Sequence, residues 1–195
     1  LMVNVYLNLG NDMKAASTLE IIRRMGQASP ENLALLGDIY LNQQAFSLAL
    51  EAYQEALKTG DGLPVETPLR TVDVLYTYGS YQLAEQLIED MRVRYGDSLN
   101  KEQSMKLLTI EAGLASARGD EDAARQSLEQ IVEQDATQAD ALIELARIYY
   151  KQARKLRIEM ASGDTDAEIE ISELVQRAIL KLEQAARHQD SRLEA

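Results

Sequence analysis

Apolar and small residues recur along the chain at the spacing of an α-helix. Ala49, Tyr53 and Ala56 follow one another at i, i+4 and i+7, which places their side chains on one face. The segment before them has a second helical set: Leu33, Leu36, Gly37 and Tyr40. The small residue allows another helix to come close, and the tyrosine fills the space one turn later. The pattern therefore predicts two helices packed against each other.

This pair of helices repeats along the chain. The first small residue of each second helix is Ala15, Ala49, Ala84 or Ala124, at spacings of 34, 35 and 40 residues. Apolar residues follow each of them at i+4 and i+7. A last copy has the matching set Leu142, Leu145, Ala146, Tyr149, Ala178, Leu182 and Ala185. We therefore expect about five repeats, at approximately 1–29, 30–64, 65–99, 100–137 and 138–190.

The period and these residue positions resemble the tetratricopeptide repeat (TPR) family, in a bacterial-type form. The resemblance implies an all-α fold, a right-handed α-solenoid of stacked antiparallel helix pairs that forms a single domain over 1–195. It also implies a protein-interaction scaffold whose first helices line a concave groove. The chain starts within a first helix, and its final "SRLEA" resembles the opening of another repeat. We therefore expect a fragment of a longer array.

The last repeat contains an insertion of some twenty residues between Gln152 and Ala178. Helical spacing continues on both sides of Ser162-Gly163, which predicts an extended helical hairpin with its tip there and a first helix of roughly Asp140–Met160. Basic residues lie on one arm (Lys151, Arg154, Lys155, Arg157) and acidic residues on the other (Asp164, Asp166, Glu168, Glu170, Glu173). This pattern predicts charge pairing across the hairpin, with a partner-docking arm as the alternative. A calcium site is a weaker alternative, because the glycine and distal glutamate of an EF-hand loop are absent.

Several helix starts carry capping signals. Ser29-Pro30 and Thr67-Pro68 each combine an N-cap residue with proline at the first helical position. Asn100 and Thr137 are further candidate caps, and "TDAE" from Thr165 has capping-box spacing. A loop is predicted around Gly60 and Gly62.

The charge balance restricts the class of partner. The chain has 32 Asp and Glu against 20 Lys and Arg, a net charge of −12. Nucleic acids and anionic membrane surfaces attract basic patches, so neither is an expected partner. No apolar run approaches the roughly 20 residues of a membrane span, so direct membrane insertion is not expected. The absence of cysteine excludes disulfides but leaves both a cytoplasmic and a bacterial periplasmic or envelope-associated location open.

No motif for catalysis or for a cofactor is present. His188 is the only histidine, and its place near the end of the last helix suits a cation at the negative end of the helix dipole. P-loop, G-x-S-x-G and H-E-x-x-H patterns are missing. We expect no enzymatic activity, no cofactor and no metal site.

The resemblance to TPR proteins gives candidate groove residues. Helical spacing on the first helices selects Glu31, Asp38, Leu41, Asn42, Asp73, Tyr76, Arg147 and Tyr150. The acidic residues of the second and third repeats favour a protein or peptide ligand that is basic and carries an apolar anchor for Leu41 and Tyr76. The alternative is a solvated acidic surface.

Three functions remain open from the sequence. The first is an interaction scaffold that binds a partner protein in its groove. The second is a recruiting or regulatory domain of a larger enzyme or of a secretion or assembly machine. The third is self-association through the open ends of the solenoid.

Overall fold

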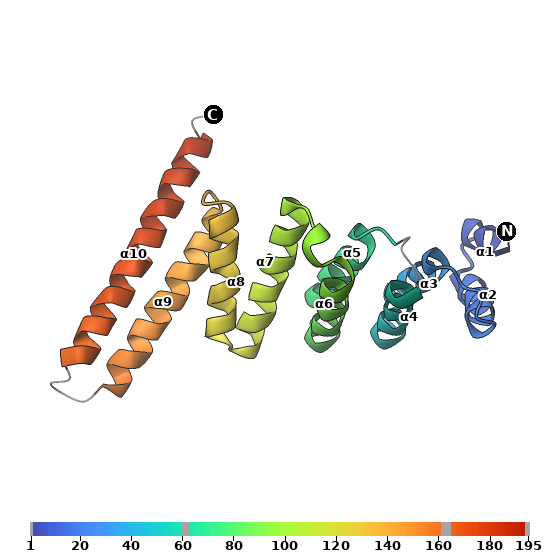
Figure 1. The fold of residues 1–195 in the computed structure, drawn as a ribbon, viewed down its shortest axis with the longest axis horizontal. Coiled ribbons are helices and arrows are strands. Elements are labelled where there is room, and N and C mark those ends of the chain that lie inside the picture. The colour runs from blue at the N-terminus through green and yellow to red at the C-terminus, as the bar shows by residue number, and fades with distance from the viewer. Residues whose placement is uncertain (1, 60–62, 161–164, 194–195) are drawn as a thin grey trace. The chain divides into compact units, whose positions relative to one another are not determined.

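The computed structural model describes residues 2–59, 63–160 and 165–193, and within them it contains helices and no strand. The predicted all-α fold is confirmed (Figure 1). The elements are α1 (Met2–Asn8), α2 (Asp12–Arg24), α3 (Pro30–Asn42), α4 (Phe46–Thr59), α5 (Glu66–Thr77), α6 (Tyr81–Tyr95), the short 3₁₀ helix η1 (Gly96–Ser98), α7 (Lys101–Arg118), α8 (Glu121–Gln134), α9 (Ala139–Glu159) and α10 (Thr165–Leu193).

 The helices pack as antiparallel pairs, and α9 with α10 forms the longest pair.

The contacts within the chain divide it into two compact units, residues 1–103 (unit 1) and 104–195 (unit 2). In unit 1, α1 packs on α2, α3 on α4 and α5 on α6, while α2 also contacts α3 and α4 contacts α6. In unit 2, α8 packs on α9 and α9 packs on α10. Neighbouring helices within each unit therefore form the stacked pairs that the repeat pattern predicts.

The core of unit 1 is made of the residues that define the repeat. Ala49, Tyr53 and Ala56 of α4 have no exposed surface, as their regular spacing predicts. A second cluster joins α2 to the next pair and contains Ala15, Ala16, Leu19, Leu36, Ile39 and Ala52. Burial of these apolar side chains is the main stabilising contribution to the stack.

Gly37 of α3 lies in close contact with Tyr53 of α4. A Cβ atom placed on Gly37 would lie 2.6 Å from Cε2 of Tyr53, well inside van der Waals contact. Tyr53 cannot easily withdraw, because it is fully buried and its hydroxyl donates a hydrogen bond to Asp38 Oδ1 at 2.6 Å. The glycine is therefore required by packing.

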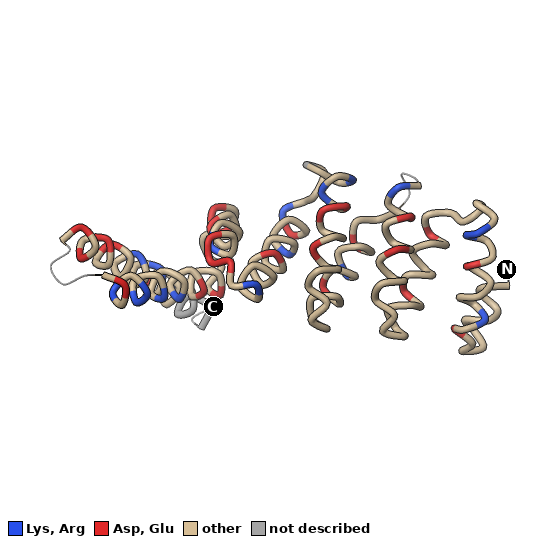
Figure 2. The backbone as a smooth tube through the Cα atoms, turned by 90° about the horizontal axis from the view of Figure 1, so that it is seen from below, with Lys and Arg blue, Asp and Glu red and all other residues tan. Residues whose placement is uncertain are grey.

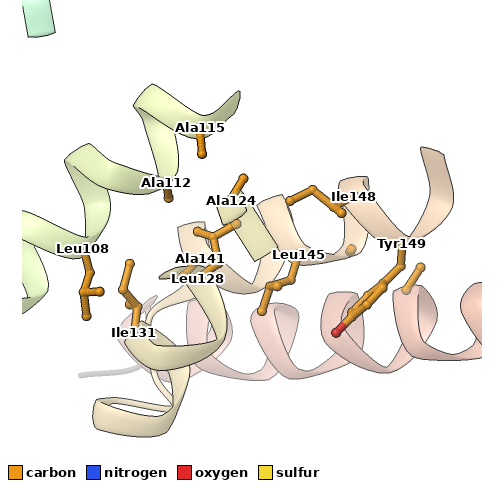
Figure 3. Packing of buried hydrophobic residues seen from close by; sticks show 12 residues of the cluster. Leu108, Ala112, Ala115, Ala124, Leu128, Ile131, Ala141, Leu145, Ile148 and Tyr149 are labelled. Atoms are coloured by element: carbon orange, nitrogen blue, oxygen red, sulfur yellow. The ribbon is translucent and has the colours of Figure 1, made fainter. Parts of the chain in front are cut away.

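The core of unit 2 joins α7, α8, α9 and α10 (Figure 3). Leu145 of α9 is fully buried within it, and Ala124 and Ile131 of α8 are 1 % and 3 % exposed. The cluster consists of Leu108, Ala112, Ala115, Ala124, Leu128, Ile131, Ala141, Leu145, Ala146, Ile148, Tyr149 and Ala178. Small residues on facing helices allow the close approach that the sequence pattern indicates.

The first-helix tyrosines make a polar contact that the sequence analysis did not anticipate. Tyr40 donates a hydrogen bond to Glu20 at 2.8 Å, and Tyr149 donates one to Glu129 at 2.9 Å. Each tyrosine occupies the same repeat position, and each acceptor lies in the helix that precedes the tyrosine's own pair. Burial and the bond to Glu20 raise the pKa of Tyr40 to about 12. The hydroxyl of this repeat position thus links successive pairs.

The last helix pair is extended, as predicted. The expected first helix of roughly Asp140–Met160 corresponds to α9 at Ala139–Glu159, and α10 runs over 29 residues from Thr165. The predicted tip at Ser162-Gly163, like the predicted loop at Gly60 and Gly62, lies outside the described residues.

Charge pairing across this hairpin is not found among the side chains that the structure describes. Lys151 of α9 instead pairs with Glu121 of α8, with 2.5 Å between Nζ and Oε1. Glu173 is 3.9 Å from Arg177 of its own helix. Figure 2 shows the basic positions of α9 and the acidic positions of α10 along the backbone. The two helices meet through apolar residues such as Leu174 and Ala178, so opposite charge on the arms does not require the charged groups to face each other.

Two of the five predicted caps are confirmed. Ser29 accepts a hydrogen bond from the Asn32 N–H at 3.3 Å, with Pro30 at the first helical position. Asn100 and Gln103 form a reciprocal capping box with both hydrogen bonds at 2.9 Å.

Two further caps are wrong, and the capping box from Thr165 adjoins residues outside the described ranges and stays a prediction. Helix α5 begins at Glu66, so Thr67 and Pro68 lie inside its first turn, where proline is tolerated because those N–H groups have no partner within the helix. At α9 the N-cap is Gln138, without a side-chain cap bond. Thr137 is instead hydrogen-bonded to Asp135 at 2.7 Å through its hydroxyl.

The extended pair gives a prediction for hydrogen exchange. We expect slow amide exchange in 146–156 of α9 and 171–182 of α10, because backbone hydrogen bonds within a packed helix pair open only with the pair itself. Native-state hydrogen exchange read by mass spectrometry or NMR measures this directly. Fast exchange across both segments would mean that the insertion does not form a stable pair in solution.

Candidate functional site

A cleft of about 540 Å³ lies between α3 and α5 in unit 1. Asp38, Leu41 and Asn42 line it from α3, and Arg70 and Val74 line it from α5. Tyr78, which follows the end of α5, completes the lining. The structure thus brings three of the predicted groove residues together with three that the sequence analysis did not assign to the groove.

Asp38 is not the free acidic group that the sequence predicts. Its Oδ1 atom lies 2.6 Å from Nη2 of Arg70 and accepts a hydrogen bond from the hydroxyl of Tyr53 at 2.6 Å. The carboxylate of Asp38 raises the pKa of Arg70, and burial followed by this hydrogen bond raises the pKa of Tyr53. The negative charge of Asp38 is therefore compensated within the cleft.

The apolar part of the cleft differs from the predicted one. Leu41 is only 9 % exposed, so it presents an edge and not a whole side chain. Tyr78 is 58 % exposed, and its ring centroid lies 5.4 Å from that of Phe46. The exposed aromatic surface at the cleft therefore comes from Tyr78. Tyr78 lies outside the repeated core positions, which is a sequence signal for exposure, but that signal does not show which site the ring joins.

The remaining candidates of the second and third repeats do not line this cleft. Glu31 is exposed at the start of α3, where a hydrogen bond from the Ser29 side chain lowers its pKa and keeps it charged. Asp73 and Tyr76 are half-buried on α5, and the ring of Tyr76 lies 5.8 Å from that of Tyr81. Their part in partner binding stays a prediction.

Arg147 and Tyr150 line a different pocket, which belongs to unit 2. It has a volume of about 370 Å³ and lies between α9 and α10. Arg147 pairs with Glu144 of its own helix, with 2.6 Å between Nη1 and Oε1. Tyr150 is 61 % exposed. We call it the terminal pocket.

The described residues give no indication of metal chemistry or of a membrane span. Across 2–59, 63–160 and 165–193, no group of three or more His, Cys, Asp or Glu side chains is arranged to hold a metal ion. Among the helices in the same ranges, none has the length and apolar composition needed to cross a membrane.

Known proteins resemble this chain in fold and not in sequence. No protein-family model matches the sequence, and no curated protein matches it. A crystal structure of MamA matches with a TM-score of 0.59 at 12 % identity, covering 100 % of this chain and 98 % of that one. A TPR repeats protein from Bacteroides fragilis matches with a TM-score of 0.59 at 16 % identity, covering 98 % and 90 %. YrrB, described as a TPR protein with an unusual peptide-binding site, matches with a TM-score of 0.50 at 15 % identity, covering 96 % and 88 %.

These matches confirm the predicted fold. The chain has the tetratricopeptide-repeat fold, with ten α-helices in the described residues that form about five helix pairs and end in a long final pair. Proteins with this fold generally act as protein–protein interaction scaffolds and are typically non-catalytic.

Proposed function

We propose that the chain is a scaffold that binds a segment of a partner protein in the cleft between α3 and α5. One observation carries the proposal: a single cleft of about 540 Å³ contains an exposed aromatic ring, an exposed amide group and an ion pair. Tyr78 supplies the ring, Asn42 the amide, and Asp38 with Arg70 the ion pair. Binding pockets in proteins typically combine apolar surface with a few well-placed polar groups.

Each of these groups has a role in the proposed complex. The exposed amide of Asn42 both donates and accepts hydrogen bonds, which suits the N–H and C=O groups of a peptide backbone. Tyr78 offers an apolar face to a side chain of the ligand, and aromatic contacts of this kind contribute much of the binding energy at interfaces. Arg70 is 61 % exposed in its side chain, so donors remain for the ligand beyond its bond to Asp38.

The charge of the protein favours a ligand segment with basic residues. The net charge of −12 and the exposed, charged Glu31 support this preference, whereas Asp38 is compensated by Arg70. Long-range attraction mainly speeds the encounter, and the apolar contact with Tyr78 determines the lifetime of the complex. Binding should therefore weaken as salt is added.

The comparison with YrrB supports a peptide as ligand, because that TPR protein is described as having a peptide-binding site. The proposal for this chain rests on its own cleft residues, since the sequence identity is 15 %.

The test uses peptides selected on the full chain from a displayed random library. For a selected peptide, we expect the combined change Asn42→Ala and Tyr78→Ala to weaken binding at least about tenfold, which corresponds to about 1.4 kcal/mol. Fluorescence anisotropy with a labelled peptide measures the Kd. Val93→Ala is the matched control, because Val93 is 81 % exposed on α6 and does not line the cleft. If the double variant binds the selected peptides as tightly as the wild type, the cleft is not the binding site.

A further inference from the structure

Packing of its repeat position does not require the hydroxyl group of Tyr53. The corresponding residues of other second helices are Leu19, Ile88 and Leu128, which have no polar side-chain atom. They are 1 %, 5 % and 6 % exposed, so an aliphatic side chain is enough to fill this buried position. A buried hydroxyl group costs free energy unless it forms a hydrogen bond. The hydroxyl of Tyr53 therefore serves a contact that is specific to the second repeat.

This contact leads from the core to the cleft between α3 and α5. The Tyr53 hydroxyl donates a hydrogen bond to Oδ1 of Asp38 at 2.6 Å, and the same oxygen lies 2.6 Å from Nη2 of Arg70. Asp38 lines the cleft from α3 and Arg70 lines it from α5, whereas Tyr53 is fully buried. Asp38 and, to a smaller extent, Tyr53 raise the pKa of Arg70, because nearby oxygen atoms favour the charged guanidinium. One carboxylate thus connects a buried hydroxyl to a guanidinium at the cleft surface.

The two ends of this chain of contacts differ in their freedom to move. The ring of Tyr53 is confined by the backbone of α3, since a Cβ atom on Gly37 would lie 2.6 Å from its Cε2 atom. The side chains of Asp38 and Arg70, by contrast, are 33 % and 61 % exposed. An ion pair this exposed holds its side chains only weakly, because their rotamer entropy opposes a single geometry. A hydrogen bond to a charged acceptor is about twice as strong as one between neutral groups, so the fixed hydroxyl restricts the carboxylate of Asp38.

We propose that Tyr53 is a positioning residue of the partner-binding cleft: its hydroxyl fixes Asp38, and Asp38 holds the guanidinium of Arg70 in the orientation that contacts the partner. This inference rests on the proposed function of the cleft. Tyr53 itself does not touch the partner. A guanidinium that is already ordered loses less side-chain entropy when the complex forms, and the affinity rises accordingly.

The substitution Tyr53→Phe tests this role, because it removes the hydroxyl and keeps the ring in the core. For a peptide selected on the full chain, we expect the Kd to rise about three- to tenfold, the usual effect of having to order one long side chain on binding. The matched control is Tyr40→Phe, which removes a similar hydrogen bond to Glu20 at 2.8 Å from a residue that does not line the cleft. The control should leave the Kd of the peptide unchanged.

A double-mutant cycle on the Kd separates positioning of Arg70 from a general effect on the core. In the Arg70→Met variant the guanidinium is absent, so adding Tyr53→Phe should have no further effect on peptide binding. The same loss with and without the guanidinium would overturn the proposal, because the hydroxyl would then act through the core. Full affinity of Arg70→Met alone would overturn it too, because Arg70 would not contact the peptide.

A measurement without peptide distinguishes failure of this inference from failure of the proposed function. The order parameter of the Arg70 Nε–H group, from ¹⁵N NMR relaxation, should fall in Tyr53→Phe and stay at the wild-type value in Tyr40→Phe. If peptide binding depends on Asn42 and Tyr78 but Tyr53→Phe changes neither the order parameter nor the Kd, the positioning role is overturned and the cleft remains the binding site. If the order parameter falls but no selected peptide depends on Asn42 and Tyr78, the proposed function fails, and the role of Tyr53 in partner binding fails with it.

Discussion

Replacing Gly37 with leucine should lower the free energy of unfolding by about 1–3 kcal/mol, the usual cost of overpacking a well-packed core. A Cβ atom alone would lie 2.6 Å from the ring of Tyr53, and the leucine adds three further carbon atoms at the same place. Leucine is a better helix former than glycine by several tenths of a kcal/mol or more, so a loss of stability would show that packing outweighs propensity. Urea denaturation followed by circular dichroism measures the change.

A double-mutant cycle identifies the residue responsible for this effect. Tyr53→Ala by itself should destabilise the protein by about 3–5 kcal/mol, as removal of a large buried aromatic side chain does. In the variant that combines it with Gly37→Leu, the leucine can occupy the space left by the ring, so the loss should be smaller than the sum of the two single losses. Unchanged stability of Gly37→Leu would mean that α3 and α4 are not in close contact at Gly37.

Replacing Leu145 with alanine should destabilise unit 2 by about 2–5 kcal/mol, because it leaves a cavity in the core between α8, α9 and α10. Leu145 is fully buried in that cluster (Figure 3). The matched control is Ile158→Ala on the same helix, which is 75 % exposed and should change stability by no more than about 0.5 kcal/mol. Denaturant titration combined with hydrogen exchange of α8 and α9 reports the loss in unit 2 itself. Equal effects of the two substitutions would contradict the assigned core.

The sequence was sufficient for the helix pairs because their signal is local and repeated. The buried small residue at the start of each second helix, such as Ala49, recurs at spacings of 34, 35 and 40 residues, and in the second repeat Gly37 and Tyr53 supply the close contact within the pair. The extended last pair followed from the same reasoning, since helical spacing continues through the insertion.

The candidate site was predicted only in part, because it depends on contacts between distant residues. Asp38 and Arg70 are 32 residues apart in the sequence, and no periodicity indicates that their side chains form an ion pair. Leu41 was expected to offer apolar surface to an anchor of the ligand, but it is only 9 % exposed where it lines the cleft. Local capping signals failed for a related reason at Thr137, where Asp135 offers a competing hydrogen bond that spacing rules do not weigh.

Hydrogen exchange of the full chain with and without a library-selected peptide tests the proposed binding function most directly. We predict that the peptide slows exchange in 38–42 of α3 and in 70–78, which covers the second half of α5 and Tyr78 after it; these segments line the cleft. The same peptide should leave exchange unchanged in 143–150 and 175–182, which line the terminal pocket. Protection confined to those two segments of unit 2, with none in α3 or α5, would contradict the proposal that the cleft of unit 1 is the partner-binding site.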